Sequence, residues 1–134
     1  HDFKNDFNLT IIEFNVDTIS ELLINDMILA TCIRGVEFSQ RALGNRSIIC
    51  DPSNPLNIEK INPSVKNRDF WMPFTPSILK EHVSDCILDH YSFNVWMTSA
   101  YSTTKLARSH LPAAIHPRDF TARPHVVDKA LQPT

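Results

Sequence analysis

The sequence predicts one domain of the α/β (α+β) class, a mixed twisted sheet flanked by short helices. Two observations support this prediction. Short apolar runs of strand length, such as 27–33 and 47–51, alternate with segments of helical period, such as 16–26. Nine prolines in 134 residues also divide the chain into short segments. A chain of this length suits one domain, and we find no internal repeat that would indicate another architecture.

The first half of the chain is expected to hold one helix and two buried strands. The helix is predicted over 16–26, because Thr18 and Glu21 have the capping-box spacing and Ile19, Leu22 and Leu23 lie on one face. The apolar runs 27–33 and 47–51 are predicted to be core strands. The loop between them therefore joins two strands.

The second half is predicted to mix short elements. Helices are expected at 55–62, where Pro63 should end the helix, and at 76–88. The remaining apolar segments are predicted to be strands, at 92–97, 111–116 and 120–127. Residues 66–70 are expected to be a loop or the entry to a strand, and 99–110, which has no clear period, a mobile loop.

Charge and cysteine content narrow the class of protein. A net charge of −2 and a pI near 6.3 argue against a general binder of nucleic acid or of membrane surfaces. The longest apolar runs are too short to span a bilayer. Cys32, Cys50 and Cys86 form no CxxC pair, and Cys32 and Cys50 are expected to be buried in apolar runs. A reducing, cytoplasmic location is the expectation.

Polar and cationic side chains gather in three places, each beside an apolar run. The three groups are Arg41, Arg46 and Ser47; Lys66 and Arg68; and His116, Thr121 and Arg123. If they converge they form an anion site, because guanidinium groups bind phosphate and carboxylate oxygens in pairs. The competing interpretation is surface ion pairing, with Asp51, Asp69 and Asp119 as partners and His116 as a packed histidine. The residue pattern alone leaves both interpretations open.

Other recognisable chemistry has no motif in this chain. Its histidines and cysteines lack zinc-site spacing, and there is no P-loop, G-x-G-x-x-G or G-x-S-x-G. Two glycines cannot build a glycine-rich phosphate cradle. A bound phosphate would therefore be held mainly by side chains.

Three ordered segments resemble a known family. They are "GVEFSQRALGNRSIICDP", "INPSVKNRDFWMPFTPSIL" and "AAIHPRDFTARPHVV". Together they are similar to the C-terminal part of the nodulation, cephamycin and tobramycin O-carbamoyltransferases, whose motifs are R-A-L-G-x-R-S-I, K-x-R-E-x-F-R-P-F-A-P and H-x-D-x-T-A-R. The resemblance extends from about Asp17 to Val127.

The resemblance implies a two-lobed enzyme of which residues 1–134 are the YrdC-like C-terminal lobe, in truncated form. ATP, expected with Mg²⁺, and carbamoyl phosphate would react here to give carbamoyl adenylate. An actin-like N-terminal lobe, which holds the only iron, would transfer the carbamoyl group to an acceptor hydroxyl. No metal site is implied in this chain, and neither a membrane nor nucleic acid is expected as a partner.

The resemblance also implies roles for individual residues. Lys66 and Arg46 are the catalytic candidates. The phosphate-binding candidates are the three polar groups together: Arg41, Arg46, Ser47, Lys66, Arg68, His116, Thr121 and Arg123. Fixed cations would offset the repulsion between two polyanionic substrates and stabilise charge in the transition state.

The chain departs from the family pattern at several positions. Met72 stands in place of an arginine, His125 in place of a glutamine, and Ser39–Gln40 in place of Gly-Pro. The spacing from His116 to Asp119 is one residue longer than usual, and a following N-T-S-F-N segment is absent. These departures keep two alternatives open: a YrdC-like module that binds RNA or nucleotide without catalysis, and a degenerate structural or regulatory lobe. The acceptor and the oligomeric state are not specified.

Overall fold

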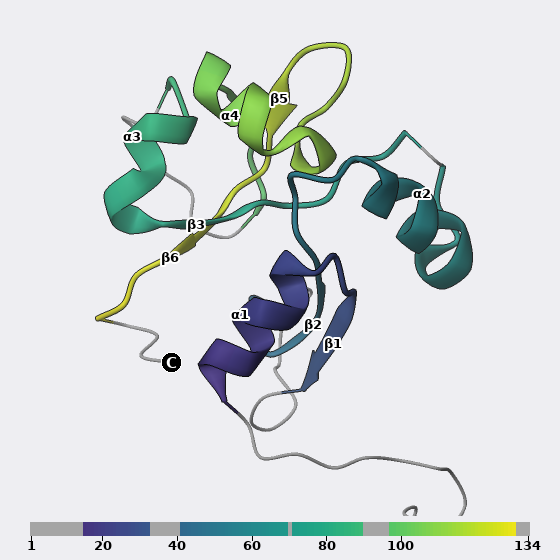
Figure 1. Cartoon of the computed structure of the whole chain (residues 1–134). Helices are drawn as coiled ribbons and strands as arrows, with labels where there is room; N and C mark the ends of the chain where they lie inside the picture. The colour runs from purple at the N-terminus through teal and green to yellow at the C-terminus, as the bar shows by residue number, and fades with distance from the viewer. Residues whose placement is uncertain (1–14, 33–40, 70, 90–96, 131–134) are drawn as a thin grey trace, which may run out of the picture.

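The computed structural model describes residues 15–32, 41–69, 71–89 and 97–130. Its helices are α1 (Val16–Ile24), α2 (Leu56–Ile61), α3 (Val83–Cys86) and α4 (Lys105–His110). Its strands are β1 (Leu29–Cys32), β2 (Arg46–Ile49), β3 (Ser77–Leu79), β4 (Tyr101–Ser102), β5 (Thr121–Ala122) and β6 (His125–Val127). In Figure 1, α1 and the β1–β2 hairpin lie below the other elements, and α2 lies to one side.

Helix α1 begins two residues before the predicted capping box. Asn15 is the N-cap, and its side chain accepts a hydrogen bond of 2.8 Å from the backbone N–H of Asp17. The capping box at Thr18 and Glu21 was therefore a wrong prediction, because asparagine at position 15 already satisfies the first turn. The helix itself is confirmed, ending at Ile24.

The two strands predicted around the first polar group are confirmed as an antiparallel hairpin. Leu29 pairs with Ile49 at one end, and Cys32 pairs with Arg46 at the other. Exposure alternates along β1, so Cys32 is exposed and the prediction that it is buried was wrong. The reason is the strand period of two, which turns successive side chains to opposite faces.

The strands run in both directions, and among the described residues they form three two-stranded sheets. Besides the hairpin, β3 and β6 pair in parallel and β4 and β5 pair antiparallel. An isolated bridge joins Ile87 to Thr103. The α/β class and the mixed strand directions are confirmed, whereas the YrdC-like fold stays a prediction.

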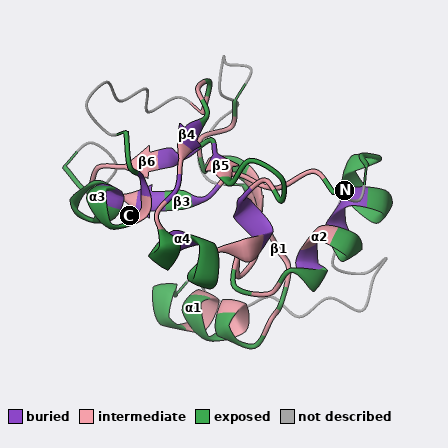
Figure 2. Ribbon diagram, turned by 90° about the horizontal axis from the view of Figure 1, so that it is seen from above, coloured by how far each residue is buried: buried purple, intermediate pink, exposed green. Residues whose placement is uncertain are grey.

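The core lies between these small sheets and helices α3 and α4 (Figure 2). One cluster of buried residues contains Ile78, Val83, Ile87 and Tyr101, and another contains Ala107, Ile115 and Ala122. Cys86 packs against both clusters. The two clusters therefore join α3, α4, β3, β4 and β5.

Several predicted elements after residue 62 were wrong. The segment 76–88 contains β3, a 3₁₀ turn and α3 rather than one helix, because Ile78 pairs with Val126 in a parallel ladder. The expected loop at 99–110 contains β4 and α4, which begins where the Thr104 side chain accepts from the Ala107 N–H. The predicted strand at 111–116 holds a 3₁₀ turn at Pro112–Ala114. Tertiary pairing and capping thus overrode the local pattern.

Two other predictions in this half had different outcomes. Pro63 does not stop the second helix, because the chain continues from α2 into a π-helical turn, Asn62–Lys66, which has Pro63 near its start. The strand predicted at 92–97 lies outside the described residues except for Met97.

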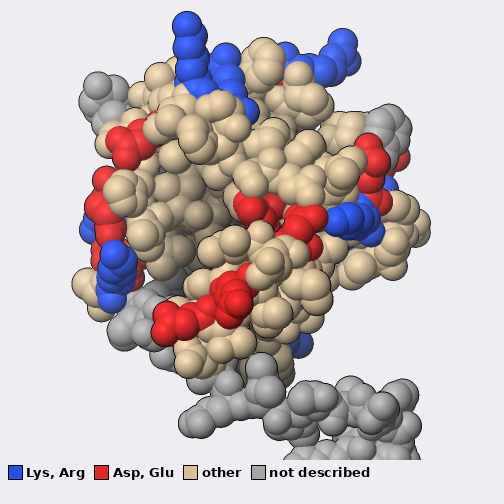
Figure 3. Space-filling model, in the orientation of Figure 1, with Lys and Arg blue, Asp and Glu red and all other residues tan. Residues whose placement is uncertain are grey.

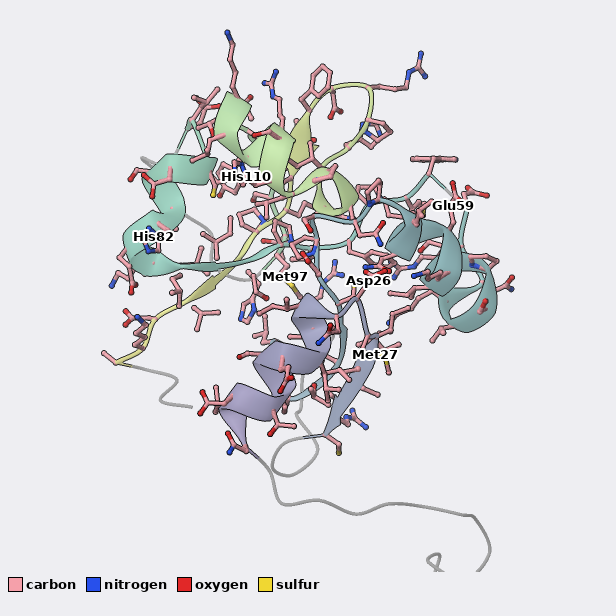
Figure 4. All side chains as sticks on the ribbon, in the orientation of Figure 1. Asp26, Met27, Glu59, His82, Met97 and His110 are labelled. Carbon is pink, nitrogen blue, oxygen red and sulfur yellow. The ribbon has the colours of Figure 1, made fainter. Side chains whose placement is uncertain are left out.

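A polar network fastens the end of α1 to α2 (Figure 4). Asp26 accepts hydrogen bonds from the side chains of Asn54 (2.6 Å), Asn57 (2.9 Å) and Lys60 (3.1 Å). Asn57 is fully buried and also donates to the Asp51 carbonyl. These bonds hold the pKa of Asp26 below its usual value, with Asn57 as the main cause. Sequence analysis did not identify this network, since its members are spread over two elements.

We expect Asn57→Ala to lower the free energy of unfolding by about 1–3 kcal/mol, because the buried amide and its part-buried bonds to Asp26 and to the Asp51 carbonyl are lost. Thermal or urea melts measure the change. The control is Glu59→Ala, an exposed substitution on the same helix, which should stay within about 0.5 kcal/mol of wild type. Equal stability of the two variants would contradict a structural role for the network.

Buried His125 should make stability depend on pH. Its ring is 6% exposed, and desolvation lowers its pKa below 6.5. Between the unfolded and folded pKa values the unfolded chain binds more protons, so stability falls as pH drops below about 6.5. We expect His125→Gln to remove this part of the pH dependence. Urea melts of both proteins at pH 7.5, 6.5 and 5.5 test this, and parallel losses of stability would contradict it.

Candidate functional site

The first polar group lies on the β1–β2 hairpin. Arg41 and Arg46 are exposed, and Arg46 is the first residue of β2. Ser47 pairs with Thr31 across the hairpin, and the Ser47 N–H donates to Thr31 Oγ1 at 3.3 Å. The Thr31 hydroxyl also lies 3.1 Å from the Ser47 carbonyl oxygen and 3.3 Å from that of Gly44. Thr31, which sequence analysis missed, thus fixes the backbone around Ser47.

A tight turn separates the two arginines. The Asn45 N–H donates to the Ala42 carbonyl at 2.9 Å, and the central residues Leu43 and Gly44 have φ of 46° and 95°. Positive φ at both central positions is the pattern of a type I′ turn. A Cβ added at Gly44 would meet no neighbouring atom, so steric crowding does not explain the glycine. The positive φ explains it, because glycine adopts this conformation without strain.

The second group lies in the loop after α2. Lys66 ends the π-helical turn, Asn67 follows with φ of 48°, and Lys66 and Arg68 are both exposed. The buried side chain of Asn62 donates to the carbonyls of Asp69 (3.0 Å) and Met72 (2.9 Å). The cations therefore project from a loop that is folded around one buried amide.

The third group lies in the loop before β5 and in β5 itself. Asp119 Oδ1 accepts from the Thr121 N–H (3.0 Å) and from the Thr121 hydroxyl (2.8 Å). These two bonds, with the N–H bond first, lower the pKa of Asp119. His116 Nδ1 lies 3.1 Å from the same oxygen, a contact that is an ion pair only when the imidazole is protonated. Arg123 is exposed just beyond β5.

Contacts join the segment that follows the second group to the loop of the third group. The rings of Trp71 and His116 meet edge to face, with centroids 5.8 Å apart. The Phe74 N–H also donates to the Ala113 carbonyl at 3.2 Å. The chain leaving Lys66 and Arg68 therefore packs against the loop of His116, although some fifty residues separate them.

The first group is placed differently. Figure 1 shows that the hairpin end at which β2 begins points away from α2. Convergence of Arg41 and Arg46 with the other cations stays a prediction, as do the binding and catalytic roles assigned to all eight residues.

Phe120 and its neighbours are further residues that sequence analysis missed. Phe120 has φ of 57°, and its carbonyl accepts from the Thr103 N–H (3.2 Å) and hydroxyl (2.6 Å). The Arg108 guanidinium lies 4.6 Å from the centre of the Phe120 ring and donates to the Thr103 carbonyl. This contact combines a cation–π interaction with hydrogen bonds. In the sequence, the only sign of a role for Phe120 is its position beside Thr121.

A left-handed residue occurs inside each of the three polar segments. Leu43, Asn67 and Phe120 lie between the functional candidates of their groups, and each has positive φ. Non-glycine residues adopt this conformation at a cost, and such strain concentrates at functional sites. Asp26 and Met97, outside the polar segments, also have positive φ, so the feature alone does not distinguish these segments.

Charge is unevenly distributed over the face in Figure 3. Lys and Arg side chains project above α4 and β5, whereas the Asp and Glu side chains lie lower on this face, over the regions of α1, α2 and α3, with some Lys and Arg beside them. Within residues 15–32, 41–69, 71–89 and 97–130, no group of three or more His, Cys, Asp or Glu side chains could hold a metal ion. The described segments also contain no helix of the length and apolarity that a membrane span needs.

Comparison with known proteins decides the family. The model of the family described as "Carbamoyltransferase C-terminus" matches residues 20–134. The chain belongs to this family. The resemblance that the three motifs indicated is thereby confirmed, and it extends through the last residue of the chain.

Longer proteins contain the related sequence. The chain is 38% identical over 114 residues to the uncharacterized protein MJ1058 of Methanocaldococcus jannaschii, covering 85% of this chain and 18% of that protein. It is 31% identical over 127 residues to MJ1051 of the same organism, covering 93% and 24%. It is 36% identical over 98 residues to nodulation protein NolO of Bradyrhizobium diazoefficiens, covering 72% and 18%. The chain thus spans a quarter or less of the length of these relatives.

The turn between the arginines can be tested directly. We expect Gly44→Ala to lower the free energy of unfolding by about 1–2 kcal/mol, because an L-residue is strained at this φ. Gly44→Asn should cost less, since asparagine tolerates the left-handed region better. Thermal melts of both variants measure the difference. Equal stability of wild type and Gly44→Ala would contradict the backbone explanation.

Proposed function

We propose that this domain binds ATP and carbamoyl phosphate and forms carbamoyl adenylate, as part of a carbamoyltransferase. Membership of the carbamoyltransferase C-terminus family carries the proposal. The contact between Trp71 and His116 supports it, because it packs together two of the three cationic segments. Transfer of the carbamoyl group to an acceptor hydroxyl would take place in an N-terminal actin-like lobe, which would hold iron.

The chemistry requires cations at defined places. Carbamoyl adenylate carries no phosphate from carbamoyl phosphate, so water must first release that group as inorganic phosphate. A carbamate oxygen then attacks the α-phosphorus of ATP, and pyrophosphate leaves. Both partners of the attack are anionic, and fixed cations lower the barrier by stabilising charge on the phosphoryl oxygens.

We assign these cationic roles to specific side chains. Lys66 and Arg46 would stabilise the transferred phosphoryl group, while the substrate oxygens would be held by the remaining candidates: Arg41, Ser47, Arg68, His116, Thr121 and Arg123. The exposure of Lys66 and Arg68 suits ligand contact, since neither is enclosed in the core. We place magnesium with the ATP phosphates, which it commonly bridges.

Replacement of single cations tests the proposal. We expect Lys66→Met and Arg46→Ala each to lower carbamoyl-phosphate-dependent ATP–pyrophosphate exchange by roughly 10²–10³, as loss of a transition-state contact does. Exposed cations contribute about 0–1 kcal/mol to stability, so melting should change little. Exchange would be measured in the longer protein that the family leads us to expect.

The matched control is Lys80→Met, which removes an exposed lysine bonded to Asp128 at 2.7 Å. It should leave exchange unchanged. Exchange within a few-fold of wild type in Arg46→Ala would mean that the hairpin arginine is structural. The same result in Lys66→Met would remove the basis for an anion site in this domain.

A further inference from the structure

Asn62 occupies an unusual position between the core and the second polar group. Its side chain is 0% exposed, yet it stands at the head of the turn that carries Lys66. The residues that follow it, from Pro63 to Asp69, are all exposed. One buried amide therefore precedes seven exposed residues.

The loop closes on Asn62 at four points. Its side-chain N–H₂ donates to the Asp69 carbonyl at 3.0 Å and to the Met72 carbonyl at 2.9 Å. Its backbone carbonyl accepts from the N–H of Arg68 at 3.1 Å and from the N–H of Asn67. Both sides of the Lys66–Arg68 segment are thus tied to the same residue.

The orientation of the amide is determined by these bonds. Among the described residues Asn62 Oδ1 has no hydrogen-bond partner although it is buried, while the N–H₂ group makes two bonds. The reverse orientation would direct Oδ1 at two carbonyl oxygens, which accept but cannot donate. The observed orientation therefore leaves the acceptor Oδ1 unsatisfied, and in return the N–H₂ group binds the carbonyls of Asp69 and Met72.

The loop that Asn62 holds is sharply bent where the cations emerge. Asn67 lies between Lys66 and Arg68 in the left-handed conformation, which asparagine tolerates better than most residues and which turns the chain sharply at this point. The bond to Met72 also fixes the segment next to Trp71, which contacts His116. Asn62 is thus linked to both the second and the third group.

We propose that Asn62 is the positioning residue of the anion site, holding Lys66 and Arg68 in the curved loop that binds phosphate groups. The identity of the ligand rests on the proposed function. The positioning of the loop rests on the hydrogen bonds of Asn62. The competing interpretation is that Asn62 contributes only to stability, as Asn57 does. Asn57 offers a control, because it is equally buried and lies five residues earlier in the same helical segment.

The first experiment measures inorganic pyrophosphate binding by calorimetry, together with melting, for Asn62→Ala and Asn57→Ala. We expect both variants to melt at lower temperature, but affinity to fall at least tenfold only in Asn62→Ala. An unchanged affinity in Asn62→Ala, or an equal loss in both variants, would overturn the proposal.

A double-mutant cycle with Lys66→Met tests whether Asn62 acts through the lysine. We expect Lys66→Met to weaken pyrophosphate binding at least tenfold in the wild-type background and less than threefold in Asn62→Ala. Additive losses would show that the two residues act independently and would overturn the proposal.

Asn67 provides variants that test the loop if Asn62→Ala does not fold. Asn67 is exposed, so replacing it disturbs no core contact. Valine is strained at positive φ and glycine is not. We expect a clear loss of pyrophosphate affinity in Asn67→Val and wild-type affinity in Asn67→Gly; equal affinities would contradict the positioning role.

Failure of wild-type binding is distinguishable from failure of the positioning role. If the wild-type protein, in the longer form used for the ATP–pyrophosphate exchange assay, does not bind pyrophosphate, the proposed function is wrong, and amide hydrogen exchange decides the role of Asn62. Faster exchange in Asn67→Val at the N–H groups of Arg68 and Met72, but not in β3, supports positioning. Wild-type exchange rates there would overturn it.

Discussion

A buried polar group needs a hydrogen-bond partner, and several buried side chains of this chain find theirs in the backbone of neighbouring segments. Its strands are only two to four residues long, so their ladders satisfy few backbone groups. Asn57, Asn62 and Thr103 are almost fully buried and bond to the backbone of neighbouring segments. Asn57 and Asn62 join parts of the chain that the small sheets leave unconnected, and Thr103 extends the β4–β5 pairing to Phe120.

This construction has a consequence for function. The residues that bind to the buried amides and hydroxyl are loop residues, and the loops carry the exposed cations. Asn62 holds the loop of Lys66 and Arg68, and Thr103 holds Phe120 next to Thr121. Side chains that bind phosphate groups must be accessible and also fixed, and anchoring a loop from inside achieves both. This arrangement is what the proposed anion site would need.

Local sequence predicted the elements that depend on local interactions. Helix α1 and the β1–β2 hairpin were recognisable, because their apolar periods continue over several residues. The parallel pairing of Ser77 with His125 was not, because it joins segments 48 residues apart and overrides a helical pattern. Helix α4 was missed because the capping hydroxyl of Thr104 precedes a segment without amphipathic period.

The sequence by itself determined the family and the candidate cations, since both depend on the identity and order of residues in three motifs. Only the tertiary structure decided which groups meet. It packs Trp71 against His116, identifies Asn62, Thr31 and Thr103 as anchors, and shows Gly44 to be a requirement of a turn. These features depend on backbone conformation and on burial, which arise when distant segments pack together and which no single motif encodes.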